Sequence, residues 1–160
     1  MPVAPPAGGL RGNLHVQWTG PTELAPELVA AYMGADYHVT GDGSRFVMHV
    51  DTASPGLAAL HAARGAACSA LLTAYNPASE ARPAAENEAA QRRLVARLAG
   101  ARVGWVDALG ADPREQWPAE PSVLALGLDR EAAISIAREF GQNALLWAGA
   151  DAVPRLLLLR

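Results

Sequence analysis

Lysine is absent from this sequence, and all 13 basic residues are arginine. This absence excludes a lysine Schiff base and a phosphate-binding P-loop, because both depend on a lysine amine. Cysteine is almost absent too. Cys68 stands alone, which excludes an intramolecular disulfide and a zinc site built from cysteines. We expect the Cys68 thiol to be buried and inert, since an apolar strand follows it directly.

Long apolar runs and basic clusters are missing as well. No run approaches the roughly 20 apolar residues that cross a bilayer, and the uncharged residues 1–9 lack the pattern of a signal peptide. A net charge of −3 without a basic stripe gives no support to a nucleic-acid partner. We therefore expect a cytoplasmic protein of bacterial type, with neither a membrane nor a nucleic acid as its partner.

The spacings that mark a metal centre or a catalytic triad are also missing. The four histidines are scattered without an HxH or HExxH pattern, and no GxSxG motif is present. His49 lies two residues from Asp51 on one face of a predicted strand, where an acid–base pair and an exposed polar face both remain open interpretations. We predict no metal site and no cofactor.

The composition that is present belongs to a folded globule. Hydrophobic residues make up 51% and charged residues 18% of the 160, which suits one domain with a sizeable core. Residues 1–21 are rich in Pro and Gly and predict a flexible arm. Residues 22–160 predict a single α+β domain.

Local patterns place the elements of the first half of this domain. A helix begins near Thr22, two strands cover residues 37–40 and 45–51 around the hairpin turn 41–43, and a helix runs from Ser54 to Gly65. The second of these strands alternates apolar and polar side chains, which is the pattern of a strand with one buried face.

The second half shows a regular rhythm. Strands are predicted at 69–75, 103–108, 122–128 and 144–148, with helices at 83–98 and 130–140. The order over residues 69–148 is β-α-β-β-α-β, the split βαβ or ferredoxin-like arrangement, for which right-handed crossovers are the natural packing. The hairpin at 37–51 and a last strand at 155–159 would extend this sheet or cover its open face.

Three polar segments should meet at one edge of such a sheet: residues 76–87, the loop 107–121 and residues 140–143. In a split βαβ, the start of the first helix, the hairpin between the middle strands and the end of the second helix share that edge. Polar side chains that converge on one edge are what a small-molecule site needs. The candidate ligand-binding residues are Asn76, Ser79, Asn87, Gln91, Trp117, Glu120, Gln142 and Asn143, and the candidate catalytic residues are Glu80 and Glu86.

Each candidate also has a structural interpretation. Asn76 before Pro77 is a common way to open a turn, and a glutamate such as Glu86 in the first helical turn complements the helix dipole. Asn87 and Gln91 lie on the apolar face of their helix. Because an unpaired buried amide costs roughly 1–3 kcal/mol, they must bond to a neighbouring loop or to a ligand.

Several of these segments together resemble a bacterial family known as domain of unknown function 3293. The resemblance rests on Leu72-Thr73-Ala74-Tyr75-Asn76-Pro77 with Ser79-Glu80, on Glu86-Asn87, on Trp117 with Glu120-Pro121-Ser122, and on Phe140-Gly141-Gln142-Asn143-Ala144. It covers roughly residues 28–158 and departs mildly at Tyr75, where the family often has Trp. The family name implies no activity, so the resemblance supports which residues matter and not what they do.

Two functional hypotheses follow. In the first, the protein binds a polar metabolite or nucleotide-like ligand at this edge. The amides of Asn76, Asn87 and Gln142 read its hydrogen-bonding groups, and Trp117 stacks on it or closes the site. Catalysis is left open. It would use Glu80 or Glu86 as a general base whose pKa is raised by burial.

The second hypothesis is a protein-interaction module that forms a homodimer through a sheet edge. The apolar tail Leu156-Leu157-Leu158-Leu159 predicts a terminal strand buried on both faces, within the domain or against a second copy. In that case the polar residues form a structural clasp, and Trp117 fills the small core of its own loop.

Overall fold

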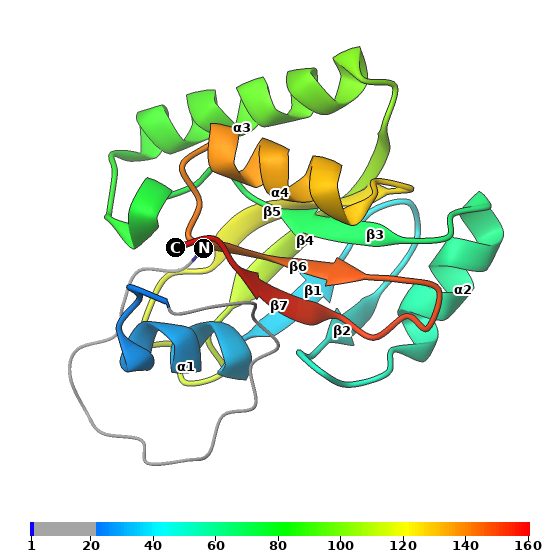
Figure 1. The fold of residues 1–160 in the computed structure, drawn as a ribbon, viewed down its shortest axis with the longest axis horizontal. Helices are drawn as coiled ribbons and strands as arrows, with labels where there is room; N and C mark the ends of the chain where they lie inside the picture. Colours follow the sequence, from blue (N-terminus) through cyan, green and yellow to red (C-terminus); the bar gives the residue numbers. More distant parts are fainter. Residues whose placement is uncertain (2–21) are drawn as a thin grey trace.

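Seven antiparallel strands form one curled sheet that resembles half of a barrel, and four α-helices pack around it (Figure 1). This computed structural model describes Met1 and residues 22–160, to which all counts refer. The strands, in the sheet order β2-β1-β4-β5-β3-β6-β7, are β1 (Asp36–Val39), β2 (Phe46–Met48), β3 (Ser69–Leu72), β4 (Gly104–Ala111), β5 (Glu120–Leu126), β6 (Ala144–Ala148) and β7 (Arg155–Leu158). The helices are α1 (Pro26–Gly34), α2 (Pro55–Arg64), α3 (Ala84–Gly100) and α4 (Arg130–Glu139), with a short 3₁₀ turn, η1 (Pro77–Ser79).

Different helices cover the two faces of the sheet. α3 and α4 lie together over one face (Figure 1), where Leu94 and Ile136 are buried against the strands. α1 and α2 pack with the other face through Leu28 and Leu57. The sheet is therefore the middle layer between two apolar cores.

β3 is buried along its whole length because it lies between these two cores. Successive side chains of a strand point to opposite faces. Leu71 accordingly packs into the core beside α2, whereas Ala70 and Leu72 pack into the core beside α3 and α4. β6 alternates in the same way, with Leu146 in the first core and Leu145 in the second. Two-sided burial explains why β6 and, after Ser69, β3 are continuously apolar in sequence.

The predicted α+β class is confirmed. The finer prediction of a ferredoxin-like core is not established, because the sheet carries seven strands and curls into a half-barrel. The predicted hairpin and last strand both extend the sheet, with β1 and β2 beside β4 and with β7 beside β6. None of the helices in the described part of the chain has the length and apolar character needed to cross a membrane.

The loop between β4 and β5 is shorter than predicted. Both strands extend into it, so that only residues 112–119 remain outside the sheet. Gly110 and Pro121 suggested a loop, but Gly110 pairs with Tyr37 on one side and with Glu120 on the other. This pairing makes Glu120 the first residue of β5, so its backbone is fixed.

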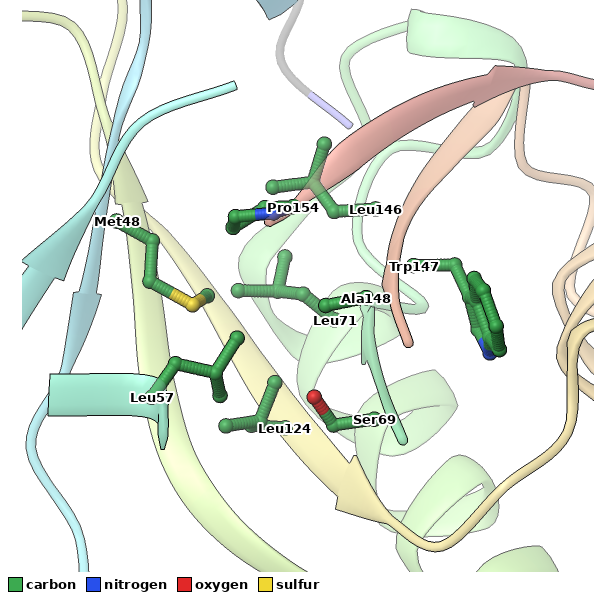
Figure 2. Close-up of a pocket in the computed structure, with 9 residues that line it drawn as sticks. All are labelled: Met48, Leu57, Ser69, Leu71, Leu124, Leu146, Trp147, Ala148 and Pro154. Atoms are coloured by element: carbon green, nitrogen blue, oxygen red, sulfur yellow. The ribbon is translucent and has the colours of Figure 1, made fainter. Parts of the chain in front are cut away.

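The interior of the half-barrel contains a small apolar gap (Figure 2). Side chains from β2, α2 and β3 line it, among them Met48, Leu57 and Leu71. The gap has no room for a water-sized molecule, so we interpret it as imperfect packing and not as a ligand site. The hydroxyl of Ser69, also in the lining, lies 2.8 Å from Nε2 of the buried His61.

We expect the free energy of unfolding to decrease as the pH falls below the ordinary histidine value of 6.5, in part because of His61. Burial lowers the pKa of His61. Between that lowered pKa and 6.5, the unfolded chain therefore binds more protons than the folded one, and stability rises with pH. Urea unfolding over this pH range measures the effect. His61→Gln keeps a polar group near Ser69 but does not titrate, so an unchanged pH dependence in this variant would contradict the assignment.

Candidate functional site

The segment that follows β3 has an unusual backbone. Asn76, Ala78 and Ser79 have positive φ angles of 46°, 56° and 57°. Asn tolerates this left-handed region well, but Ala and Ser do not. Such residues cost of order 1–3 kcal/mol each and persist only where their surroundings hold them. The contacts of this turn are therefore the first feature of the site to explain.

The side chains of Asn76 and Asn87 hold the turn by bonding to each other. Asn87 accepts a hydrogen bond from the Asn76 backbone N–H through Oδ1 (2.9 Å) and donates one to Asn76 Oδ1 through Nδ2 (2.9 Å). Asn76 Oδ1 also accepts from the backbone N–H of Arg82 (3.1 Å). We call this pair of side chains the amide clasp. It joins the end of β3 to the first turn of α3.

Two further bonds support the same junction. Gln91, one turn beyond Asn87 on α3, accepts a hydrogen bond from the backbone N–H of Ala74 (2.8 Å). Gly141, which follows α4 with φ 67°, accepts one from the backbone N–H of Ala78 (2.8 Å). A side chain at Gly141 would also crowd Pro77, since an added Cβ would lie 3.2 Å from the Cβ of that proline. The strained turn is thus bound to both helices of its layer.

Glu120 brings a buried carboxylate to this clasp. Its Oε2 accepts a hydrogen bond from Asn76 Nδ2 (3.1 Å). Its Oε1 lies 2.6 Å from the α-ammonium nitrogen of Met1. Glu120 is only 3% exposed, so its negative charge is compensated mainly by this ammonium group.

Gln142 binds the same ammonium group. Its Oε1 accepts a hydrogen bond from the Met1 nitrogen at 2.6 Å, while its Nε2 donates to the Tyr75 carbonyl oxygen at 3.1 Å. Met1 is 2% exposed. Burial lowers the pKa of its α-amine, and the charge of Glu120 opposes that shift.

Tyr32, Ser79 and Asn143 form a second buried group at this edge. The Tyr32 and Ser79 hydroxyl oxygens lie 2.5 Å apart, and Asn143 Nδ2 donates to both, at 3.3 and 3.1 Å. Burial raises the pKa of Tyr32, to which the charge of Glu120 also contributes. Asn143 Oδ1 has no hydrogen-bond partner among the described residues, although it is fully buried. We refer to Glu120, Gln142 and Asn143 together as the acceptor site.

Trp117 lies in the loop 112–119, where its side chain is buried in the same core as Tyr32. Asp112 shapes this loop by accepting hydrogen bonds from two of its backbone N–H groups (2.9 and 2.8 Å). A hollow open to solvent lies beside the loop, with Trp117 and Ala119 in its lining. Trp117 therefore fills core space and also borders a surface depression formed by its own loop.

The two candidate catalytic carboxylates lie apart from the buried groups. Glu80 is exposed and pairs with Arg82 at 3.3 Å, and Glu86 is exposed in the first turn of α3. Neither carboxylate is buried with the polar groups of this edge. The buried carboxylate at this edge belongs to Glu120, which the sequence placed among the ligand-binding candidates.

The structure brings the three polar segments of the sequence together through these bonds. Asn76, Ser79 and Asn87 come from the first segment, Glu120 from the second, and Gln142 and Asn143 from the third. Gln91 supports them from α3. The described residues contain no group of three His, Cys, Asp or Glu side chains that could hold a metal ion.

Sequence analysis missed Tyr32 and Met1. A tyrosine on the apolar face of α1 carries no signal that its hydroxyl reaches a turn 47 positions away. Met1 belongs to the predicted arm of residues 1–21, and of that arm the structure describes Met1 alone. Met1 combines an apolar side chain with an α-ammonium group, and such a residue could pair with a buried carboxylate. No sequence pattern, however, indicates that its partner is Glu120.

We expect Asn87→Ala to lower the free energy of unfolding by about 1–3 kcal/mol, because it leaves the partly buried backbone N–H of Asn76 without its partner and removes one of the two donors to Asn76 Oδ1. The neighbouring Glu88 is exposed on α3, and Glu88→Ala should change stability by no more than about 0.5 kcal/mol. Urea unfolding of both variants tests this. Equal small effects would show that the amide clasp does not hold the turn.

Comparison with known proteins gives one match. The model of a family described as "Protein of unknown function (DUF3293)" matches residues 72–145, the stretch that runs from the end of β3 to the start of β6. No curated protein and no solved structure matches the chain. The matched stretch contains the amide clasp and all three residues of the acceptor site. Over these residues, the chain is a member of the DUF3293 family of proteins of unknown function.

Proposed function

We propose that the protein binds a small polar ligand at the acceptor site. The observation that carries this proposal is the buried Glu120 carboxylate, whose Oε1 is paired with a terminal ammonium group and with no side chain of the domain. Taking a carboxylate out of water is costly unless a cation or several donors replace the water. A domain that needed only a clasp at this edge would not need this charge.

The polar groups at this edge have two different roles: some fix the geometry, and others accept hydrogen bonds from the Met1 ammonium group. The amides of Asn87 and Gln91 bond to Asn76 and to the backbone, and the Asn76 amide also holds one oxygen of Glu120, so these amides fix the geometry. Glu120 and Gln142 instead direct acceptor atoms at a group on a distant part of the chain. The hollow beside Trp117 is lined by the loop that leads directly into Glu120, and we propose that it receives the solvent-facing part of a ligand. The proposed activity is binding, without a catalytic role for Glu80 or Glu86.

The setting that we propose is the bacterial cytoplasm. A single cysteine and no disulfide suit a reducing compartment. We also propose that β3 to β6 derive from a ferredoxin-like core, which the neighbour order β4-β5-β3-β6 and the two crossover helices on one face support.

A thermal-shift screen against metabolites and nucleotides tests the binding proposal. A ligand at 100 times its dissociation constant should stabilise the fold by about 2.7 kcal/mol. Glu120→Gln should abolish the shift, whereas Glu86→Gln, which removes an exposed carboxylate from the same edge, should preserve it. A ligand that stabilises both variants equally would bind elsewhere, and the proposal would then be wrong.

The second candidate is a homo-oligomer in which the polar cluster serves only as a clasp. β7 lies at the end of the sheet with one side unpaired, and Leu158 at its end and Leu159 after it are partly exposed. Exposed strand edges favour pairing with a second copy. Sedimentation measured over a wide range of protein concentration distinguishes the candidates: a constant monomer mass would exclude this one, and a rising mass would support it.

A further inference from the structure

The orientation of the acceptor site is fixed by its own hydrogen bonds. The Tyr75 carbonyl oxygen can only accept, so the NH₂ group of Gln142 must face it and Oε1 of Gln142 must face the site. The same logic applies to Asn76. Its Oδ1 accepts from Arg82 N–H and from Asn87 Nδ2, so its NH₂ group faces Glu120. The acceptor atoms of Glu120 and Gln142 therefore have directions that do not depend on a choice of amide flip.

These acceptors need a cation. In the described part of the chain, no Arg side chain lies within ion-pair distance of Glu120, which pairs with the Met1 ammonium alone. The Asn76 amide donates a hydrogen bond to Oε2 of Glu120, and Oε1 of Glu120 pairs with the ammonium group of Met1. Asn143 Oδ1 adds a buried acceptor without a partner in the adjoining group. A neutral ligand with few donors would leave the carboxylate uncompensated.

The group that fills the site also carries an apolar chain. Met1 is buried almost completely and belongs to the core that contains Tyr32 and Trp117. An –NH₃⁺ group has three donors on one compact centre, of which two meet Glu120 and Gln142 at 2.6 Å. The planar fork of a guanidinium group would present its donors in a different geometry.

We infer that the acceptor site is specific for a primary ammonium group attached to an apolar chain, and that the α-ammonium group of Met1 occupies it in this structure. This inference rests on the proposed function, since it names the class of ligand that the same site binds. It also implies that a free amine and the Met1 ammonium group compete for Glu120 and Gln142.

The absence of lysine gives a direct test of the occupant. The α-amine of Met1 is the sole primary amine of this sequence. In protein whose intact mass includes Met1, acetic anhydride therefore transfers one acetyl group to this nitrogen, with release of acetate and a proton, and intact-mass spectrometry follows the reaction. We expect the folded wild-type chain to react at least about tenfold more slowly than Glu120→Gln, a factor that corresponds to about 1.4 kcal/mol. Glu86→Gln is the matched control and should react like wild type. Equally fast reaction of all three proteins would overturn the inference.

Acetylation also removes the positive charge of Met1 from the acceptor site without any amino-acid substitution. The acetylated wild-type chain should bind n-butylammonium, seen as shifts of the side-chain NMR signals of Asn76, Gln142 and Asn143. The unmodified chain should bind it at least about tenfold more weakly, a factor that again corresponds to about 1.4 kcal/mol. n-Butanol has the same apolar chain and no charge, so equal shifts with butanol, or no shift with butylammonium, would show that the site does not select ammonium.

Failure of this inference can be distinguished from failure of the proposed function. Suppose that a neutral or anionic ligand stabilises the wild-type chain but not Glu120→Gln. The proposed binding site would then be supported, and the inferred specificity for ammonium would be wrong. If neither the metabolite library nor butylammonium acts through Glu120, both proposals are wrong.

Discussion

The hydrogen bonds between Asn76 and Asn87 are the interaction on which this edge of the molecule depends. They hold a turn whose backbone lies in the left-handed region at three residues that are not glycine. That turn sets where Asn76 Nδ2 points, and thereby holds one oxygen of the Glu120 carboxylate. It also carries Ser79 to Tyr32 and Asn143. Without the amide clasp, neither buried polar group would have its present partners.

Some polar side chains of this edge bond within the β3–α3 junction, and others bond to the ammonium group of Met1. This difference explains why the same cluster of residues led to both a structural-clasp and a ligand-binding hypothesis. A clasp satisfies its own polar atoms. Both polar atoms of the Asn87 amide do so at the β3–α3 junction, where Gln91 Oε1 also accepts a bond. A receptor keeps polar atoms for another group, as Glu120 and Gln142 do. The clasp interpretation therefore describes Asn87 and Gln91, and ligand binding is what we propose for Glu120 and Gln142. The two interpretations differ because each is based on different residues of the cluster.

Sequence patterns predicted the elements well because the two-sided burial of β3 and β6 and the capped helices leave strong local signals. Asp129 caps α4 by accepting a hydrogen bond from the Ala132 backbone N–H (2.8 Å). The β4–β5 loop was predicted too long, because Gly110 is paired in the sheet, which only the register with Tyr37 and Glu120 shows. The curl of the sheet could not be predicted, since it depends on how seven strands twist together. The Tyr32 hydroxyl and the Met1 ammonium group reached the site through tertiary contacts that no local spacing encodes.

The junction between β3 and α3 has a consequence for how the molecule opens. The backbone N–H groups of Ala74 and Asn76 lie beyond the end of β3, and they donate to side chains of α3 instead of to a neighbouring strand. Exchange of these two amide hydrogens with solvent deuterium therefore requires α3 to separate from the sheet, and fraying of β3 is not sufficient. These two amides report on α3 from outside it, so the polar edge and the helix above it exchange as one cooperative unit.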